Sequence, residues 1–400
     1  MFVDLHIHSK FSRATSENMV LKTIDRMASL KGLDVVGTGD TTHPKWLDEI
    51  KENLIEVYDG IYQLKEGKIF FVLSVEISTI YREGDRLCRI HHVILEPDME
   101  YVEQFNGELS KFGDLSLDGR PVVNLTSQEL VELAKEIDEW CEIFPAHAWT
   151  PHYSIFGVHG YDSMRECYGK YVNKVYALET GLSSDPPMNW RVSKLDRFTL
   201  VSNSDAHSPW PWRLGREANV FELEDLSYRE IVRSIRGGKI LFTIETYPEY
   251  GKYHFSGHRE CGLSFSPEEE KALEYICPRC GRPLTKGVLR RVEELADRPD
   301  HYRPKDRPKY YHLIPLTELI AKSEGISSLS ARRVWDIYTS IVRKYCSEYA
   351  VLLDVDINEL RKNVGVRLAK MIEAVREDRV KLNPGYDGVY GEIIFNENTH

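Results

Sequence analysis

The chain has 400 residues, a formal net charge of -11 at pH 7 and 42% hydrophobic residues. Its length predicts two or three domains and at least one large core. No apolar stretch approaches the roughly 18 residues of a membrane-spanning helix, and the N-terminus lacks a secretory layout, so we expect a cytoplasmic protein with no membrane partner. Seven cysteines, three of them between Cys261 and Cys280, indicate thiols and a metal site rather than a disulfide framework.

Residues 1–245 alternate short β-branched runs with amphipathic segments. The periodicity predicts helices over 19–30 and 128–141, and strands over 69–75, 93–95, 175–178 and 198–202. This alternation indicates an α/β fold with a parallel sheet, open or closed into a barrel. In such barrels the functional residues gather where strands end and loops begin.

Side chains that bind metals stand at the edges of these apolar runs. His6 and His8 are two residues apart in an extended segment, so they project from one face of a strand. The later candidates, each next to a further run, are Asp40, His43, Glu76, His91, His92, His147, Asp205 and His207. A single His-x-His pair is equally well explained as two surface histidines. Recurrence of the arrangement along the chain instead indicates a metal centre.

A second module, residues 246–300, begins where Pro, Gly and Tyr replace the alternating pattern. It contains His258-x-x-Cys261 and, further on, Cys277-x-x-Cys280. Paired ligands on two turns are typical of a closed tetrahedral zinc site, with His254 as a reserve ligand. Because so short a module cannot supply its own hydrophobic core, we expect this zinc to be structural.

Residues 301–400 read as a largely helical region, with amphipathic segments over 316–323, 330–349 and 366–376 and a glycine-rich turn over 383–391 that leads into a short strand. Segments 279–291 and 303–309 are rich in Lys and Arg. They form either a solvated basic face or a surface that follows phosphates, as a DNA-binding region does.

The order of the metal-type motifs in residues 1–245 resembles that of the polymerase and histidinol phosphatase (PHP) family. That family forms a distorted (β/α)7 barrel, binds up to three metals and hydrolyses phosphoesters. With the zinc module, the segment Ser204–Asn219 and the tail motif Pro384–Gly388, the whole chain resembles the archaeal endonuclease Q family. Its members cut DNA on the 5′ side of uracil, hypoxanthine or xanthine and at abasic sites. The resemblance implies damaged DNA as partner. A sliding clamp is a further candidate, although no Gln-x-x-Leu-x-x-aromatic-aromatic segment precedes His400.

The same resemblance implies the ligand sets. One metal takes His6, His8, Glu76 and Asp205; a second takes Glu76, His92 and His147, with Glu76 bridging; a third takes Asp40 or His43 with His207. Many family members carry another ligand where this chain has Ala14. We prefer His92 to His91 because the family's ligand directly precedes the strand run. Two or three ions are therefore expected, with Zn²⁺, Mn²⁺ and Mg²⁺ all open.

Contacts with a flipped base require aromatic faces, and the late barrel loops supply several. The candidates for substrate binding are Trp149, Tyr153, Trp190, Trp210, Trp212 and Arg216, each with a core or ion-pair role as the alternative. His152 is either a general acid for the leaving oxygen or a plain loop histidine. Two other functions remain open, a phosphatase for a small phosphate monoester and a non-catalytic DNA-binding scaffold.

Overall fold

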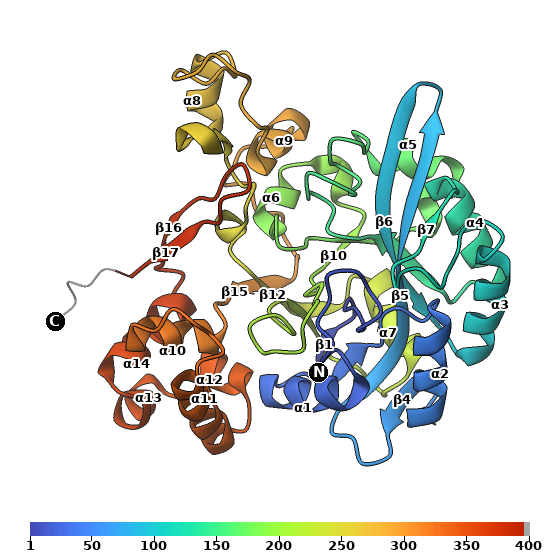
Figure 1. Cartoon of the computed structure of the whole chain (residues 1–400), viewed down its shortest axis with the longest axis horizontal. Helices are drawn as coiled ribbons and strands as arrows, with labels where there is room; N and C mark the ends of the chain where they lie inside the picture. Colours follow the sequence, from blue (N-terminus) through green and yellow to red (C-terminus); the bar gives the residue numbers. More distant parts are fainter. Residues whose placement is uncertain (396–400) are drawn as a thin grey trace.

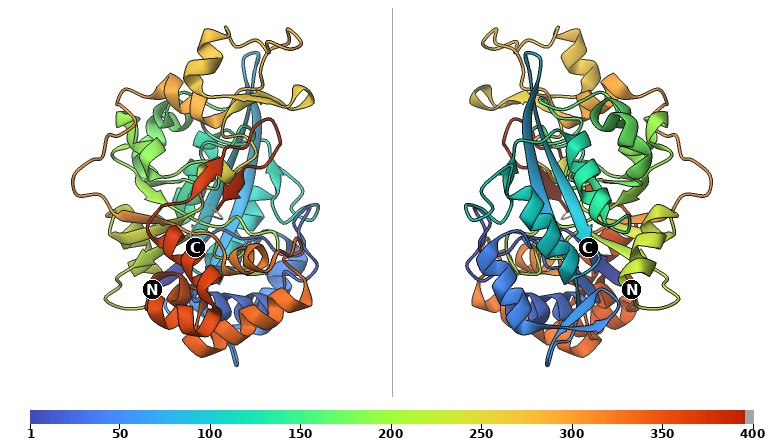
Figure 2. Two further views of the ribbon diagram at one scale, coloured as in Figure 1. Left: turned by 90° about the vertical axis from the view of Figure 1, so that its left-hand side faces the viewer. Right: turned by 90° about the vertical axis from the view of Figure 1, so that its right-hand side faces the viewer.

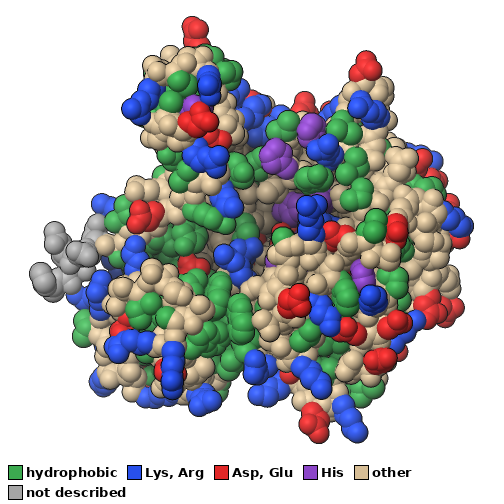
Figure 3. Space-filling model, in the orientation of Figure 1, with side chains coloured by type: hydrophobic (Ala, Val, Ile, Leu, Met, Phe, Trp, Pro, Cys, Tyr) green, Lys and Arg blue, Asp and Glu red, His purple; other side chains and the backbone are tan. Residues whose placement is uncertain are grey.

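Three parts of the chain surround a central hollow: an α/β part, a small cysteine-containing module and a group of helices (Figures 1 and 3). The computed structural model describes residues 1–395. The last residues before His400, where a clamp motif was sought, lie outside this range. Among the described helices, none has both the length and the apolar character needed to cross a membrane.

Most strands belong to one large mixed sheet with the order β15-β12-β11-β1-β2-β5-β4-β3. Off this path, β6 and β7 pair with β5, and β8 pairs with β6. The strands are β1 (Phe2–Asp4), β2 (Val35–Gly37), β3 (Leu54–Tyr58), β4 (Ile61–Leu64), β5 (Phe70–Glu83), β6 (Arg86–Glu96), β7 (Val122–Val123), β8 (Glu142–Pro145), β9 (Ala177–Glu179), β10 (Thr199–Val201), β11 (Ala218–Phe221), β12 (Ile240–Glu245), β13 (Ser256–His258), β14 (Leu263–Phe265), β15 (Lys309–His312), β16 (Lys381–Asn383) and β17 (Glu392–Ile394).

Helices cover the outside of this sheet and form the C-terminal group (Figure 1). They are α1 (Leu21–Lys31), α2 (Pro44–Asn53), α3 (Met99–Leu109), α4 (Ser127–Ile137), α5 (Met164–Tyr168), α6 (Pro186–Trp190), α7 (Tyr228–Arg236), α8 (Pro267–Ala272), α9 (Val288–Leu295), α10 (Leu316–Glu324), α11 (Arg332–Tyr345), α12 (Glu348–Leu353), α13 (Ile357–Val364) and α14 (Val366–Arg376). Local sequence explains the ends of several helices. Thr126 and Glu129 form a capping box on α4, and Gly32 ends α1 with a φ of 101°.

The sheet is mixed, which corrects the expectation of a parallel sheet. Strands β1, β2 and β5 pair in parallel, whereas β5–β6, β6–β8, β1–β11 and β11–β12 are antiparallel. For the β5–β6 pair the cause is the turn at Gly84 and Asp85, which joins Glu83 directly to Arg86. A two-residue connection allows only an antiparallel pair, because a parallel pair needs a long crossover. Strands β9 and β10 form a separate parallel ladder.

The C-terminal region is attached to the α/β part by a strand and by a shared core. Strand β15 pairs in parallel with β12 at the edge of the large sheet. One hydrophobic cluster contains Ile24 and Val36 together with Leu319, Val334 and Ile372 of the C-terminal region. At the same junction, the buried Lys31 ammonium lies 2.8 Å from a Glu348 carboxylate oxygen. These contacts fix the helical group against the sheet, below the cysteine-containing module (Figure 2).

The C-terminal helices differ from the predicted ones at two points. The segment expected as one helix over 330–349 is two helices, α11 and α12, because Cys346 adopts a φ of 71° between them. Helix α13 was not predicted. The glycine-rich turn lies between β16 and β17, which form an antiparallel hairpin.

Candidate metal centre

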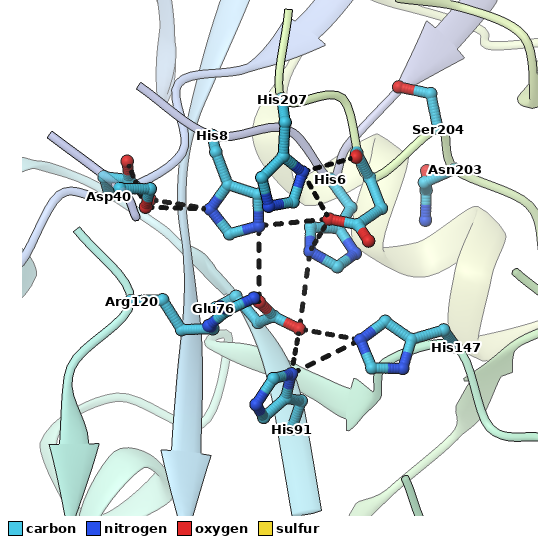
Figure 4. Close-up of polar contacts among 12 residues, drawn as sticks. His6, His8, Asp40, Glu76, His91, Arg120, His147, Asn203, Ser204 and His207 are labelled. Carbon is cyan, nitrogen blue, oxygen red and sulfur yellow. Dashed lines mark hydrogen bonds and ion pairs between the residues drawn. The ribbon is translucent and has the colours of Figure 1, made fainter. Parts of the chain in front are cut away.

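The metal-type residues of the α/β part meet at one end of its strands (Figure 4). His6 and His8 follow β1, Glu76 lies within β5, and His147 and Asp205 follow β8 and β10. Strand ends on one side of a sheet converge, so residues far apart in sequence reach one place. Two groups of donor atoms form there, each with its donors within 4.8 Å of one another.

The first donor group contains His6, His8, Glu76 and Asp205. Nε2 of His8 lies 3.1 Å from Asp205 Oδ1 and 3.3 Å from Glu76 Oε2. Nε2 of His6 lies 3.6 Å from Asp205 Oδ1 and 3.7 Å from Glu76 Oε1, and this buried nitrogen has no hydrogen-bond partner among the described residues. A buried polar atom without a partner requires an explanation. Two imidazoles and two carboxylates around one point fit a divalent metal ion.

The second donor group contains Glu76, His91 and His147. Oε1 of Glu76 lies 2.8 Å from His91 Nδ1 and 3.0 Å from His147 Nε2. The two imidazole nitrogens are 3.4 Å apart. Because Glu76 belongs to both groups, its carboxylate lies between them.

The structure corrects the preference for His92 over His91. In the β5–β6 ladder His91 is opposite Ser78 and Val93 is opposite Glu76, so His91 shares the face of Glu76. His92 points to the other face, where its Nδ1 lies 2.9 Å from the Tyr168 hydroxyl and its Nε2 lies 3.2 Å from Thr79 Oγ1. Counting back from the Gly84 and Asp85 turn would have predicted this register from the sequence.

A carboxylate holds the Nδ1 atom of each histidine in the first pair. Oε2 of Glu179 lies 3.0 Å from His6 Nδ1, and Oδ1 of Asp40 lies 3.0 Å from His8 Nδ1. Such contacts orient the imidazole and leave Nε2 free to bind a metal. Glu179 also accepts the backbone N–H of His147 at 2.7 Å, so one carboxylate positions members of both groups.

The residues expected at a third metal are not brought together. Asp40 is occupied by His8 and accepts hydrogen bonds from Ser9 and Ser12. His43 stacks on Phe11 with ring centroids 4.4 Å apart. His207 lies against His8, with its Nδ1 2.9 Å from the Asp205 carbonyl oxygen. Within residues 1–395, no candidate metal group combines His207 with Asp40 or His43.

In this centre burial and neighbouring charges shift pKa values in opposite directions. At Glu76 and His6 the neighbouring charges have the larger effect. Burial alone would raise the pKa of Glu76, but His91, Arg120 and His6 hold that pKa well below its usual value. Burial alone would lower the pKa of His6, but Glu179 and Glu76 raise it well above its usual value. His91 differs, because burial lowers its pKa to about 4. The bridging carboxylate is therefore ionised, as a metal ligand must be.

Several residues of the centre have strained backbone conformations. Asp40, His147 and Asp205 have φ angles of 54°, 31° and 46°. Positive φ is uncommon outside glycine and persists only where surrounding contacts enforce it. The fold thus keeps local strain at three of the positions where the sequence predicted ligands.

Arg120 was missed by the sequence analysis. Its Nη1 donates to Glu76 Oε2 at 3.0 Å, from the loop between α3 and β7. The sequence around it, Asp118-Gly119-Arg120, is an ordinary polar loop and carries no signal for such a contact.

The cysteine-containing module brings its four predicted donors together. His258, Cys261, Cys277 and Cys280 have ligand atoms within 4.8 Å of one another, and His258 Nδ1 lies 3.8 Å from Cys280 Sγ. His254, the reserve ligand, is buried elsewhere and stacks on Phe255. Basic residues of the module largely pair with acids: Arg282 with Glu260, Lys286 and Arg290 with Glu294, and Arg291 with Asp162.

The candidate substrate residues lie in different environments. Trp149 is a core residue that donates to Asn189 Oδ1 at 2.8 Å, and Trp190 packs against Tyr310. Trp210, Trp212 and Trp335 pack against one another, with ring centroids 5.8 to 6.0 Å apart. Tyr153 lies beside His91, with ring centroids 4.9 Å apart, whereas His152 is exposed beside Tyr253.

The remaining candidates, Trp212 and Arg216, line a cavity close to Asp205. Its lining includes Trp212, Arg213, Arg216, Tyr247, Tyr250 and Tyr390. The Arg216 guanidinium donates through Nε and Nη2 to the carbonyl oxygen of Ser204, the residue before Asp205. Figure 3 shows histidines and Lys or Arg side chains gathered around the hollow on this face.

Comparison with known proteins finds relatives for part of the chain and for the whole of it. The model of the MJ0043 C-terminal domain matches residues 315–379. An uncharacterized protein, MJ0043 of Methanocaldococcus jannaschii, is 37% identical over 252 residues, which are 62% of this chain and 31% of that protein. This chain therefore spans under a third of the length of that relative.

Two solved structures match nearly the whole chain. The lesion-specific endonuclease PfuEndoQ of Pyrococcus furiosus has a TM-score of 0.89 and 36% identity, covering 99% of this chain and 95% of its own. Endonuclease Q in complex with a 27-mer duplex bearing an abasic lesion at the active site has a TM-score of 0.88 and 36% identity, with coverages of 99% and 96%.

The α/β fold, the convergent donor groups and these matches define an enzyme of the nuclease class. Within that class, the chain belongs to the endonuclease Q family.

Proposed function

We propose that this chain is a metal-dependent DNA repair endonuclease, which hydrolyses the phosphodiester on the 5′ side of uracil, hypoxanthine or xanthine and at abasic sites. The observation that carries the proposal is the pair of donor groups joined by Glu76, in a chain similar over its length to a lesion-specific endonuclease. The complex of endonuclease Q with an abasic duplex supports damaged DNA as the substrate.

In this proposal His6, His8, Glu76 and Asp205 hold one divalent ion, and Glu76, His91 and His147 hold another. When bound, such ions lower the pKa of water and neutralise charge on the phosphate. The chain's own contribution is orientation. Glu179 and Asp40 fix the two imidazoles of the first group, and Glu76 stays ionised between the groups. His207, at the mouth of the centre beside Asp205, faces the incoming phosphate.

The three parts of the chain have separate tasks in this proposal. Residues 1–245 form the catalytic part, with β9 and β10 completing the wall of a distorted PHP-type barrel. Residues 246–300 hold one structural zinc ion through His258, Cys261, Cys277 and Cys280. The C-terminal region, from residue 301, closes the hollow opposite the centre and contacts DNA.

The cavity lined by Trp212, Tyr247 and Tyr250 receives the flipped base in this proposal. Aromatic faces suit stacking on a base, and the Arg213 and Arg216 guanidinium groups supply donors. Arg216 lines this cavity and donates to the carbonyl oxygen of Ser204, the residue before Asp205. In this proposal the contact fixes the distance between the base cavity and the phosphate at the metal centre. His152, an exposed residue next to Tyr153, is the proposed proton donor to the leaving oxygen.

Incision of a matched set of duplexes tests the function. The set carries uracil, hypoxanthine, an abasic site or no lesion, and Mn²⁺ or a chelator is present. We expect nicks only at lesions and only with metal. Asp205→Asn should abolish nicking and leave DNA binding intact, whereas Asp225→Asn, at an exposed loop position, should behave as wild type. Nicking that survives chelation, or its complete absence in wild type, would refute the proposal.

A further inference from the structure

Arg120 is the one Lys or Arg side chain that forms an ion pair with Glu76 or Asp205 among the described residues. All other partners of these two carboxylates are histidines: His6, His8, His91, His147 and His207. Arg120 therefore brings a permanent positive charge to the centre, independent of pH and of metal content.

The loop that carries Arg120 is held firmly. A Cβ atom on Gly119 would lie 2.2 Å from Asp40 Oδ2, so only glycine permits this close approach. The Arg120 backbone N–H donates to Asp118 Oδ1 at 3.1 Å, and the Pro121 carbonyl oxygen accepts from the Ser78 N–H on β5 at 3.0 Å. The backbone before Arg120 thus lies against Asp40, which orients His8, and the backbone after it is bonded to β5.

The guanidinium itself is not saturated. Within residues 1–395 the guanidinium makes one hydrogen bond, from Nη1 to Glu76, and 23% of the side chain is exposed. A guanidinium has five N–H donors in a planar fork. Several of them remain free to bind another anion at the open side of the centre.

Arg120 also lies on the side of the centre where a third metal was expected. Its loop contacts Asp40 and Ser12, and Phe11 accepts the Gly119 N–H at 3.1 Å. On that side Ala14 offers no ligand, Asp40 is bound to His8 and His43 faces Phe11. On the same side, the Arg120 guanidinium brings a positive charge to Glu76.

We infer that Arg120 binds a non-bridging oxygen of the scissile phosphate and stabilises the charge that develops on it. This inference rests on the proposed phosphodiester hydrolysis. The guanidinium pairs with Glu76 through Nη1, and its remaining N–H donors would bind the phosphate beside a metal held by Glu76. Two parallel N–H donors suit a phosphate better than a single ammonium does. No covalent step passes through Arg120.

Three measurements test the inference: single-turnover nicking, Mn²⁺ binding and phosphate binding. The variants are Arg120→Met and Arg120→Lys, with the exposed neighbour Arg13→Met as control. In single-turnover nicking of a uracil duplex, we expect Arg120→Met to be slower by about 100-fold, as for loss of one donor to a developing charge. Arg120→Lys should regain part of the rate, and Arg13→Met should match wild type. An unchanged rate in Arg120→Met would overturn the inference.

Calorimetry separates phosphate binding from a merely structural role. Mn²⁺ should bind metal-stripped Arg120→Met at least as tightly as wild type, because Glu76 is released from its cation. Weaker Mn²⁺ binding would mean that Arg120 only holds Glu76 in place, which would overturn the inference. Inorganic phosphate, titrated into the Mn²⁺-loaded proteins, should bind Arg120→Met about tenfold more weakly than wild type. If wild type fails to nick DNA, the proposed function fails, while the phosphate titration still decides the role of Arg120.

Discussion

Oδ1 of Asp40 lies 3.0 Å from Nδ1 of His8, and both side chains are buried. This contact turns Nε2 of His8 toward Glu76 and Asp205 and repeats, with a different carboxylate, at His6. The two imidazoles are therefore oriented before any ion binds. Asp40 thus orients a donor although it does not itself join a donor group.

Removing this orienting charge should weaken metal binding. We expect Asp40→Asn to lower the affinity for Mn²⁺ by about 10 to 100-fold, the usual effect of losing a carboxylate that supports a ligand histidine. Glu179→Gln should do the same at His6. Isothermal titration of metal-stripped protein measures the affinity, and circular dichroism checks the fold. Affinities equal to wild type in both variants would show that these carboxylates do not support the ligands.

The neighbouring histidines of β6 offer a matched pair of variants. We expect His91→Asn to lose about one bound metal per chain, because His91 lies 2.8 Å from Glu76. His92→Asn should keep its metals but lower the free energy of unfolding by about 1 to 3 kcal/mol, because buried partners such as the Tyr168 hydroxyl lose a hydrogen bond. Metal analysis and urea denaturation measure the two effects. Loss of metal from the His92 variant alone would reverse our assignment.

The cysteine-containing module should depend on zinc. Cys280→Ser is expected to lose one zinc ion per chain and to become sensitive to protease within residues 252–296, because four donors close this small module. Cys346→Ser, at another exposed cysteine, is the control and should keep its zinc. Elemental analysis and limited proteolysis measure the outcome. A Cys280 variant with full zinc content would exclude Cys280 as a ligand.

The proposed base cavity predicts a difference between lesions. Trp212→Ala should slow nicking at uracil by about tenfold, because stacking of one base on an aromatic ring contributes about 1 to 3 kcal/mol. Nicking at an abasic site, which has no base to stack, should change little. Trp140→Ala, at a half-buried tryptophan surrounded by Arg229, Arg233 and Arg236, is the control. Equal losses at uracil and at the abasic site would argue against base binding at Trp212.

Glu96 predicts a dependence of stability on pH. Burial raises the pKa of this carboxyl to about 8, and Thr41 is its hydrogen-bond partner. The folded chain therefore holds a proton that the unfolded chain releases above its ordinary pKa near 4.5. The resulting stability is fully present below about pH 4.5 and is lost as the pH rises through about 8.

Glu96→Gln should remove this dependence, because the amide stays neutral. Relative to wild type, the variant should gain stability between pH 5 and pH 8 on the order of 3 kcal/mol. Exposed Glu66→Gln is the control. Urea denaturation across this range measures the difference. A constant difference between Glu96→Gln and wild type at all pH values would show that Glu96 does not titrate with folding.

Much of the centre was predictable because its ligands follow local rules. An extended His6-x-His8 places two imidazoles on one face, and polar residues after apolar strands fall at one end of the sheet. The His258 and cysteine spacing predicted a four-donor group for the same reason, since two short turns bring its members together. Helix 366–376 was likewise found from its periodicity.

Other features depend on contacts between distant segments. Burial of Trp149 against Asn189, the joining of β15 to β12, and the contact of Arg120 with Glu76 each unite residues that no local pattern relates. The choice between His91 and His92 could have been predicted in part. The turn at Gly84 sets the register of the β5–β6 ladder, and that register decides which face of the sheet each histidine occupies.

The sequence by itself determined the donor types, their order along the chain and the four-donor group of the cysteine-containing module, because residue chemistry and short spacings are local properties. Only the tertiary structure decided which donors share a carboxylate, that Asp40 contacts His8 and not His207, and that Arg120 reaches Glu76. Those outcomes depend on strand register and on loop packing, through which residues 30 to 200 positions apart come within 3 to 4 Å.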